Sequence, residues 1–175
     1  MLVRAAGLAL AVVGLVGCAT RPTADAGMPW TSGRLSVRVE AAAAQPARSV
    51  NADFDLRGDG ERGELRLSSP LGTMIAATRW APGVAVLDQG QGEVRYADLD
   101  SLSRDALGEV LPLRALPDWL AGRPWAGAAS VMQPSGFEQL GWTVSLSSLG
   151  EGLIAAVRET LPRVVVRVRL TQPGS

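Results

Sequence analysis

The sequence contains no histidine and no lysine, and it has a single cysteine in 175 residues. Without histidine, the chain lacks the side chain that most often acts as a general base or as a metal ligand. Its 17 basic residues are all arginines, so it has no lysine for a Schiff base or for a phosphate-binding loop. One cysteine can form neither an internal disulfide nor a cysteine metal cluster. These absences exclude most catalytic chemistry, and we expect no catalytic residue, no metal site and no enzyme.

The charge balance excludes a further class of protein. The 17 basic residues are matched by 17 acidic residues, so the formal net charge is zero. A nucleic-acid-binding domain needs a basic surplus, so we expect no nucleic-acid partner. Hydrophobic residues make up 47% of the chain, which suffices for a packed core, and the length is that of one domain.

The first residues have the pattern of an export signal. Arg4 supplies a positive charge, and the uncharged apolar run from Ala5 to Val16 is shorter than the roughly 20 residues that span a bilayer. The run ends in Leu15-Val16-Gly17-Cys18, which resembles the bacterial lipobox, where the cysteine is lipidated and becomes the mature N-terminus. An ordinary secretory signal with a chance cysteine is the alternative.

We therefore expect three segments in the chain. Residues 1–17 are predicted to be a lipoprotein signal peptide, residues 18–29 a lipidated flexible tether, and residues 30–175 a single domain. Lipid on Cys18 would be the only attached group, and no cofactor is expected. Residue 19 is alanine and not the aspartate that retains many such lipoproteins in the inner membrane, which by analogy favours the outer membrane.

Polar and apolar residues alternate at a period of two in much of the mature chain, as expected of half-buried strands. The turn Gly58-Asp59-Gly60 makes residues 50–68 a hairpin. The sequence predicts eight or nine strands, and the segments that carry them are residues 34–40, 50–57, 64–68, 73–80, 84–87, 93–97, 137–147 and 163–170.

The period changes between residues 98 and 125. A helix is predicted over 100–108, with Asp98 or Asp100 as its cap and Gly108 at its end, and a second short helix over 117–121. Strands with one apolar face must bury that face. We therefore predict a mainly β (α+β) fold, an incomplete, unclosed antiparallel β-barrel with short helices covering the opening, although periodicity alone also allows a sandwich.

One loop residue stands out. Leu71 lies between Pro70 and Gly72, in a tight turn after the third expected strand. A large apolar side chain at a loop tip is unfavourable in water unless it contacts a membrane or a partner. Folding back onto the core is the other possibility, and the local sequence leaves both open. Asp53 and Asp55 alternate with apolar residues and are interpreted as a solvated face.

Several short motifs follow one another in a fixed order along residues 30–170. They are Ser68-Ser69-Pro70-Leu71-Gly72, Leu107-Gly108, Leu111-Pro112-Leu113, Leu116-x-x-Trp119-Leu120-x-Gly122-x-Pro124, Gly141-Trp142-x-Val144 and Leu161-Pro162-Arg163. No single motif is specific, but the ordered set resembles the LolB family, the outer-membrane lipoprotein receptors of Gram-negative bacteria. Two features depart from the family. Leu56 stands where many members have tryptophan, and only one Arg/Val strand precedes Ser175, so we expect a final strand to be missing or replaced.

The resemblance implies a function. Members accept a lipidated cargo lipoprotein from a periplasmic carrier, LolA, hold its acyl chains in the half-barrel, and release it into outer-membrane lipid. It implies that the Pro70-Leu71-Gly72 loop is exposed and helps to place cargo in the bilayer, and we expect a lipid-anchored monomer at the periplasmic face of the outer membrane. With the alternation, it predicts an acyl-chain cavity lined by Val37, Phe54, Leu56, Leu65, Leu67, Leu116, Trp119, Leu120, Trp142, Val144 and Val166.

Two rival functions stay open at this point. A non-transporting envelope lipoprotein that uses its sheet as a protein-binding scaffold would share the lipobox and the strands. An enzyme is disfavoured by the absence of histidine and lysine. An apolar cavity would separate the receptor from the scaffold, and hydrolysis of a generic ester would revive the enzyme.

The lipobox generates the first testable prediction. Changing Cys18 to Ala should leave an unprocessed or mislocalised precursor, because signal cleavage and acylation both need the thiol. Mass spectrometry and membrane fractionation of the expressed protein measure the two effects. A Cys18→Ala variant with the parent's mass shift and the parent's fractionation would show that Cys18 is not the lipidated residue.

Overall fold

The computed structural model describes residues 27–42 and 46–171. Within these residues, one antiparallel sheet of eleven strands runs in the order β6-β5-β4-β3-β2-β1-β11-β10-β9-β8-β7. The edge strands β6 and β7 are not paired with each other, so the barrel is open, as the sequence predicts. The strands are β1 (Thr31–Val39), β2 (Arg48–Gly58), β3 (Gly63–Ser68), β4 (Met74–Ala81), β5 (Val84–Asp88), β6 (Glu93–Tyr96), β7 (Ser130–Gln133), β8 (Gly136–Gln139), β9 (Trp142–Ser145), β10 (Leu153–Arg158) and β11 (Val164–Leu170).

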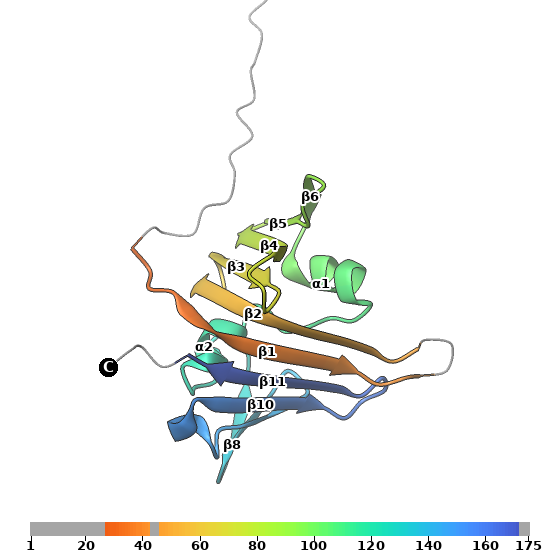
Figure 1. Ribbon diagram of the computed structural model, residues 1–175. Helices are drawn as coiled ribbons and strands as arrows, with labels where there is room; N and C mark the ends of the chain where they lie inside the picture. The colour runs from red at the N-terminus through yellow and green to blue at the C-terminus, as the bar shows by residue number, and fades with distance from the viewer. Residues whose placement is uncertain (1–26, 43–45, 172–175) are drawn as a thin grey trace, which may run out of the picture.

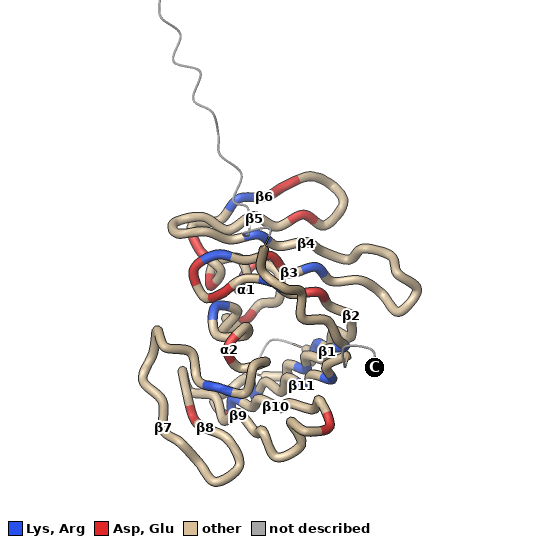
Figure 2. The backbone as a smooth tube through the Cα atoms, turned by 90° about the vertical axis from the view of Figure 1, so that its left-hand side faces the viewer, with Lys and Arg blue, Asp and Glu red and all other residues tan. Residues whose placement is uncertain are grey.

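The first and last strands meet in the middle of this sheet. Val37 of β1 stands opposite Val166 of β11 on one side and opposite Val50 of β2 on the other. Because side chains alternate along a strand, this register places the apolar positions of the three strands on one face. Figure 2 shows the strands following an arc, so that this face lies on the inside of the curve.

The two predicted helices cover the inside of the arc (Figures 1 and 2). Helix α1 (Leu99–Leu107) begins at Asp98, whose carboxylate accepts a hydrogen bond from the backbone N–H of Ser101 at 2.7 Å. It ends at Gly108, which has a left-handed φ of 77°. Helix α2 (Leu116–Leu120) has Pro117 in its first turn. Helix α1 contacts β5 and β6, and α2 contacts β2.

The C-terminal half of the sheet differs from the sequence prediction. Residues 137–147 are not one strand, because a two-residue turn at Leu140 and Gly141, with φ of 54° and 77°, folds them into β8 and β9. Strands β7 and β10 were not predicted. Strand β11 pairs with β1 and with β10, so the end of the strand order lies at β7 and not at β11. A short 3-10 turn, η1 (Leu149–Glu151), precedes β10.

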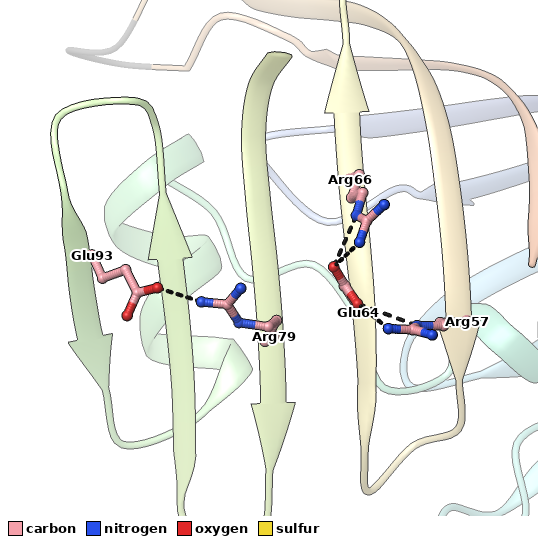
Figure 3. Close-up of polar contacts among 5 residues, drawn as sticks. All are labelled: Arg57, Glu64, Arg66, Arg79 and Glu93. Carbon is pink, nitrogen blue, oxygen red and sulfur yellow. Dashed lines mark hydrogen bonds and ion pairs between the residues drawn. The ribbon is translucent and has the colours of Figure 1, made fainter. Parts of the chain in front are cut away.

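The outer face of the N-terminal half carries a row of ion pairs. Figure 3 shows Glu64 on β3 between Arg57 and Arg66, with N–O distances of 2.7 Å to each. Both guanidinium groups also lie over the ring of Trp30, at 4.5 and 4.6 Å from its centroid. Further along the row, Arg79 pairs with Glu93 (Figure 3). These contacts fasten the start of β1 to the outside of β2 and β3.

This row makes stability depend on pH. Burial by itself raises the pKa of the Glu64 carboxyl, but hydrogen bonds and charge from Arg57 and Arg66 outweigh burial and hold the pKa below its ordinary value. A carboxyl with a lowered pKa stabilises the fold above its unfolded pKa, and the effect is lost as the pH falls through the folded pKa.

Changing Glu64 to Gln should therefore lower the free energy of unfolding at neutral pH by about 1–3 kcal/mol. In denaturant unfolding, the difference from the parent should shrink below a pH of about 4, where the parent's carboxyl is protonated as well. Glu61→Gln, at an exposed position of the same hairpin, is the control and should change little. A deficit for Glu64→Gln that stays constant down to acidic pH would contradict the ion-pair explanation.

Candidate functional site

A cavity of about 260 Å³ lies between the inner face of the sheet and the helical segment that covers it. Of the described residues that line it, only Thr78, Gln89 and Ser103 have polar side chains. The Ser103 hydroxyl is already engaged within the cover, since it donates to the Asp100 carbonyl and accepts from the Leu111 N–H, both at 3.2 Å. The cavity therefore offers shape and apolar surface to a ligand, and few groups for a polar one.

The lining comes from both layers of the structure. From the sheet come Leu35, Val37, Val50, Leu65, Leu67, Ile75, Ala76, Thr78, Leu87, Trp142, Ile154, Ala156, Val166 and Val168, and from the adjoining loop Gln89. From the cover come Leu102, Ser103, Ala106, Leu107, Leu111, Pro112, Leu113, Leu116, Trp119 and Leu120.

One end of the cavity is closed by Trp119, and a buried amide fixes that ring. The indole N–H of Trp119 donates to Oε1 of Gln139 at 2.8 Å. The same Gln139 oxygen accepts from the Trp125 N–H at 2.9 Å, and its Nε2 donates to the carbonyls of Trp125 and Ala128 at 2.7 and 2.8 Å. Trp142 packs beside Trp119, with 6.3 Å between ring centroids. The closed end is therefore held by satisfied polar groups behind an apolar wall.

The opposite end opens to solvent. Among the lining residues, Ile75 at the start of β4, Gln89 after β5 and Ala106 on α1 are exposed, and they mark the mouth of the cavity. Ile75 is four residues from Leu71, so the β3–β4 turn lies beside this mouth. Exposed apolar side chains and the cavity lining are thus continuous at Ile75.

The β3–β4 turn presents Leu71 to solvent. The Leu71 side chain is 95% exposed, which excludes the alternative that it folds back onto the core. The turn is held by backbone hydrogen bonds of 2.8 Å, from the Ser69 N–H to the Thr73 carbonyl and from the Gly72 N–H to the Ser69 carbonyl. Gly72 has a φ of 82°, a conformation that favours glycine.

The structure places most, but not all, of the predicted cavity residues on the cavity wall. Those that line it are Val37, Leu65, Leu67, Leu116, Trp119, Leu120, Trp142 and Val166. Phe54, Leu56 and Val144 do not: they are 3%, 3% and 1% exposed and lie in the packed core. Phe54 and Leu56 belong to β2, whose inner face is contacted by α2, so no space remains over them. Val144 stands between Phe137 of β8 and Ala156 of β10 and is enclosed in the packed core.

Sequence reasoning also missed part of the wall. The apolar face of α1 and the Leu111–Pro112–Leu113 segment line the cavity. In the sequence, the face of α1 is visible only as apolar residues at helical spacing, which does not show what the face contacts.

Cys18 and the predicted signal peptide lie outside the described residues. Over the described ranges, no group of three or more acidic, histidine or cysteine residues could hold a metal ion, and no helix is long and apolar enough to cross a membrane.

The fold and the cavity define a class of protein: an open antiparallel barrel with an apolar cavity that opens beside an exposed apolar loop. Comparison with known families identifies the family within this class. The family model for outer membrane lipoprotein LolB matches residues 30–171. The chain belongs to the LolB family of outer membrane lipoproteins.

Individual relatives agree with this assignment. An outer-membrane lipoprotein LolB from Bordetella parapertussis is 37% identical over 182 residues, which cover 95% of this chain and 91% of the relative. A LolB from Ralstonia nicotianae is 35% identical and covers 78% of this chain and 73% of its own length. A LolB from Thiobacillus denitrificans is 34% identical and covers 78% of both. The family supports a role in lipoprotein localisation.

Proposed function

We propose that this protein is an outer-membrane-anchored receptor that accepts lipoproteins from a LolA-type periplasmic carrier, holds their acyl chains in the cavity, and releases them into the outer membrane. The observation that carries the proposal is the apolar cavity whose mouth lies beside Leu71. A scaffold protein needs no such cavity. The proposed organisation is a signal peptide over residues 1–17, a tether over 18–29 with lipid on Cys18, and a receptor domain over 30–175.

The cavity suits acyl chains because the dominant force is the removal of methylene groups from water. Each buried methylene contributes about 0.8 kcal/mol. A chain that passed through water between the carrier and the bilayer would lose this contribution for every methylene. Passage from one apolar mouth to another avoids that loss, and it needs no catalytic group.

Leu71 has a role in the release step under this proposal. Its exposure in water costs up to about 1.5–3 kcal/mol, and insertion into lipid recovers that cost. Insertion would also bring the mouth against the bilayer, because the turn and the mouth adjoin through Ile75. Cargo chains could then leave the cavity for lipid without crossing water.

The cavity can be tested at its mouth. Ala106→Trp places a bulky ring on an exposed lining position of α1, where it should narrow the opening without disturbing the core. Binding of a fluorescent long-chain fatty acid should weaken about tenfold or more, which corresponds to at least about 1.4 kcal/mol. Arg104→Trp, on an exposed position of α1 outside the lining, is the matched control. Equal binding by parent and Ala106→Trp, or loss in both variants, would contradict the assigned mouth.

The role of Leu71 predicts a split between two steps of transfer. Leu71→Glu should still accept a lipoprotein from the carrier, because the cavity is unchanged. It should fail to deliver that lipoprotein to liposomes, because a carboxylate resists the hydrocarbon. Leu71→Ile should be nearly silent, since only apolar character is required. If Leu71→Glu blocks acceptance and spares delivery, Leu71 acts in docking or in the cavity, and the proposed release step is wrong.

A further inference from the structure

The exposed leucines of the described residues all lie at one end of the sheet. They are Leu71, Leu140 and Leu161, which are 95%, 47% and 83% exposed. Leu71 is in the β3–β4 turn, Leu140 in the β8–β9 turn and Leu161 in the β10–β11 turn. The strand registers place these turns together, and we name this the mouth end of the sheet.

The opposite end of the sheet has a different character. The β2–β3 turn there contains Asp59, Glu61 and Arg62, and the β4–β5 turn contains Pro82 and Gly83. Trp30 is exposed at that end, at 38%, but it is covered by the guanidinium groups of Arg57 and Arg66. Val131 and Met132 are also exposed, on the edge strand β7. Among the described residues, the exposed leucines therefore lie at the mouth end, in turns that join the strands.

We propose that Leu161, in the turn between β10 and β11, is a second side chain that enters the bilayer and contacts it across the mouth end from Leu71. This proposal deepens the release step of the proposed function and rests on it. Two apolar contacts separated by several strands would fix the mouth against the membrane. A single contact at Leu71 would let the domain pivot about one turn.

The turn that carries Leu161 is firmly held. Arg163 binds Glu159 at 2.8 Å within the turn and Glu40 at the end of β1 at 3.1 Å. Arg158, at the end of β10, binds Glu109 at 2.6 Å and also donates to the Pro162 carbonyl at 3.3 Å. The exposure of Leu161 is thus a property of a braced turn, one that cannot easily fold back to bury the side chain.

The same contacts lower the electrostatic cost of approaching lipid. Glu159 and Arg163 flank Leu161 and form an ion pair with each other, so the turn brings no net charge of its own to the interface. An unpaired charge beside the leucine would resist transfer out of water. The pairing is therefore what a lipid-facing tip needs.

The arrangement of the leucines favours lipid over a protein partner. Protein interfaces have a contiguous, well-packed apolar core. Here the leucines are single tips on separate turns, and the polar β5–β6 turn with Gln89 and Gln91 lies at the same end. A fluid bilayer can accommodate isolated tips one by one, whereas a rigid protein surface would need a separate pocket for each.

The experiment uses the full-length lipidated protein in liposomes of phosphatidylethanolamine and phosphatidylglycerol. Leu161→Cys is labelled with an environment-sensitive fluorophore, and nitroxide-bearing lipids report contact with the acyl region. Leu71→Cys is the comparator, and Glu61→Cys in the β2–β3 turn is the control at the opposite end. The parent should take up no label, because its single cysteine carries lipid.

The fluorescence emission of labels at residues 161 and 71 should shift to the blue and be quenched by the nitroxide lipids. The emission of the label at residue 61 should remain that of a label in water. A quenched label at 71 with an aqueous label at 161 would overturn the inference and leave the proposed function intact. Aqueous labels at both positions would overturn the release step itself. A change at 161 that appears only on addition of the carrier would show that Leu161 docks protein and not lipid.

A functional readout complements the label. Leu161→Glu should slow delivery to liposomes and leave acceptance from the carrier unchanged, while Leu161→Met should behave as the parent. Because Leu161 is exposed, the denaturant midpoint should be the same in all three proteins. Delivery by Leu161→Glu at the parent's rate would overturn the proposal.

Discussion

The inner face of the sheet is continuously apolar, and in the described chain only two short helices cover it. Helices α1 and α2 have nine and five residues, and they are the helical cover that the described chain places over the arc of strands. A well-packed interior leaves few voids larger than a water molecule, and a void forfeits contacts on its lining. Here the short cover leaves about 260 Å³ of apolar space. The mismatch between sheet and cover is the origin of the cavity.

The frame around that space is braced by hydrogen bonds and ion pairs. Gln139 ties α2, β8 and the Trp125 loop together through four hydrogen bonds of 2.7–2.9 Å. Ser103 ties α1 to the segment that follows it. On the outside, the Glu64 ion pairs hold β2 to β3. Polar groups therefore fix the wall from behind, and the surface that faces the space stays apolar.

The sequence predicted those elements whose two faces differ. Strands β1, β2 and β11 alternate cleanly and were found, as were both helices. Strand β10 was missed because Leu153, Ala155 and Val157 make its outer face apolar too. Strand β7 is exposed throughout and has no burial pattern to reveal it. The β8–β9 turn escaped notice because a leucine with positive φ is uncommon.

The sequence predicted which face of the strands is apolar, but it did not predict which residues of that face border the cavity. Phe54 and Val37 share the inner face of the sheet, yet only Val37 lines the cavity, since α2 lies over β2. Which apolar residues border a void depends on where the cover ends, and that is a tertiary property. Period and spacing carry no information about it. The exposure of Leu71 was likewise undecided by its local sequence until the sheet placed its turn at the mouth.

In the proposed transfer, the hydrophobic free energy of an acyl chain is nearly the same in the cavity and in the bilayer. A methylene gains about 0.8 kcal/mol on leaving water whether it enters the cavity or the bilayer. The difference between the two sites must then come from ordering: a chain in a cavity loses rotamer freedom that it keeps in fluid lipid. A rigid, preformed cavity lets a chain enter without remodelling the protein, but it also confines that chain. Confinement favours release once the mouth touches lipid, so the direction of transfer needs no energy source beyond contact with the bilayer.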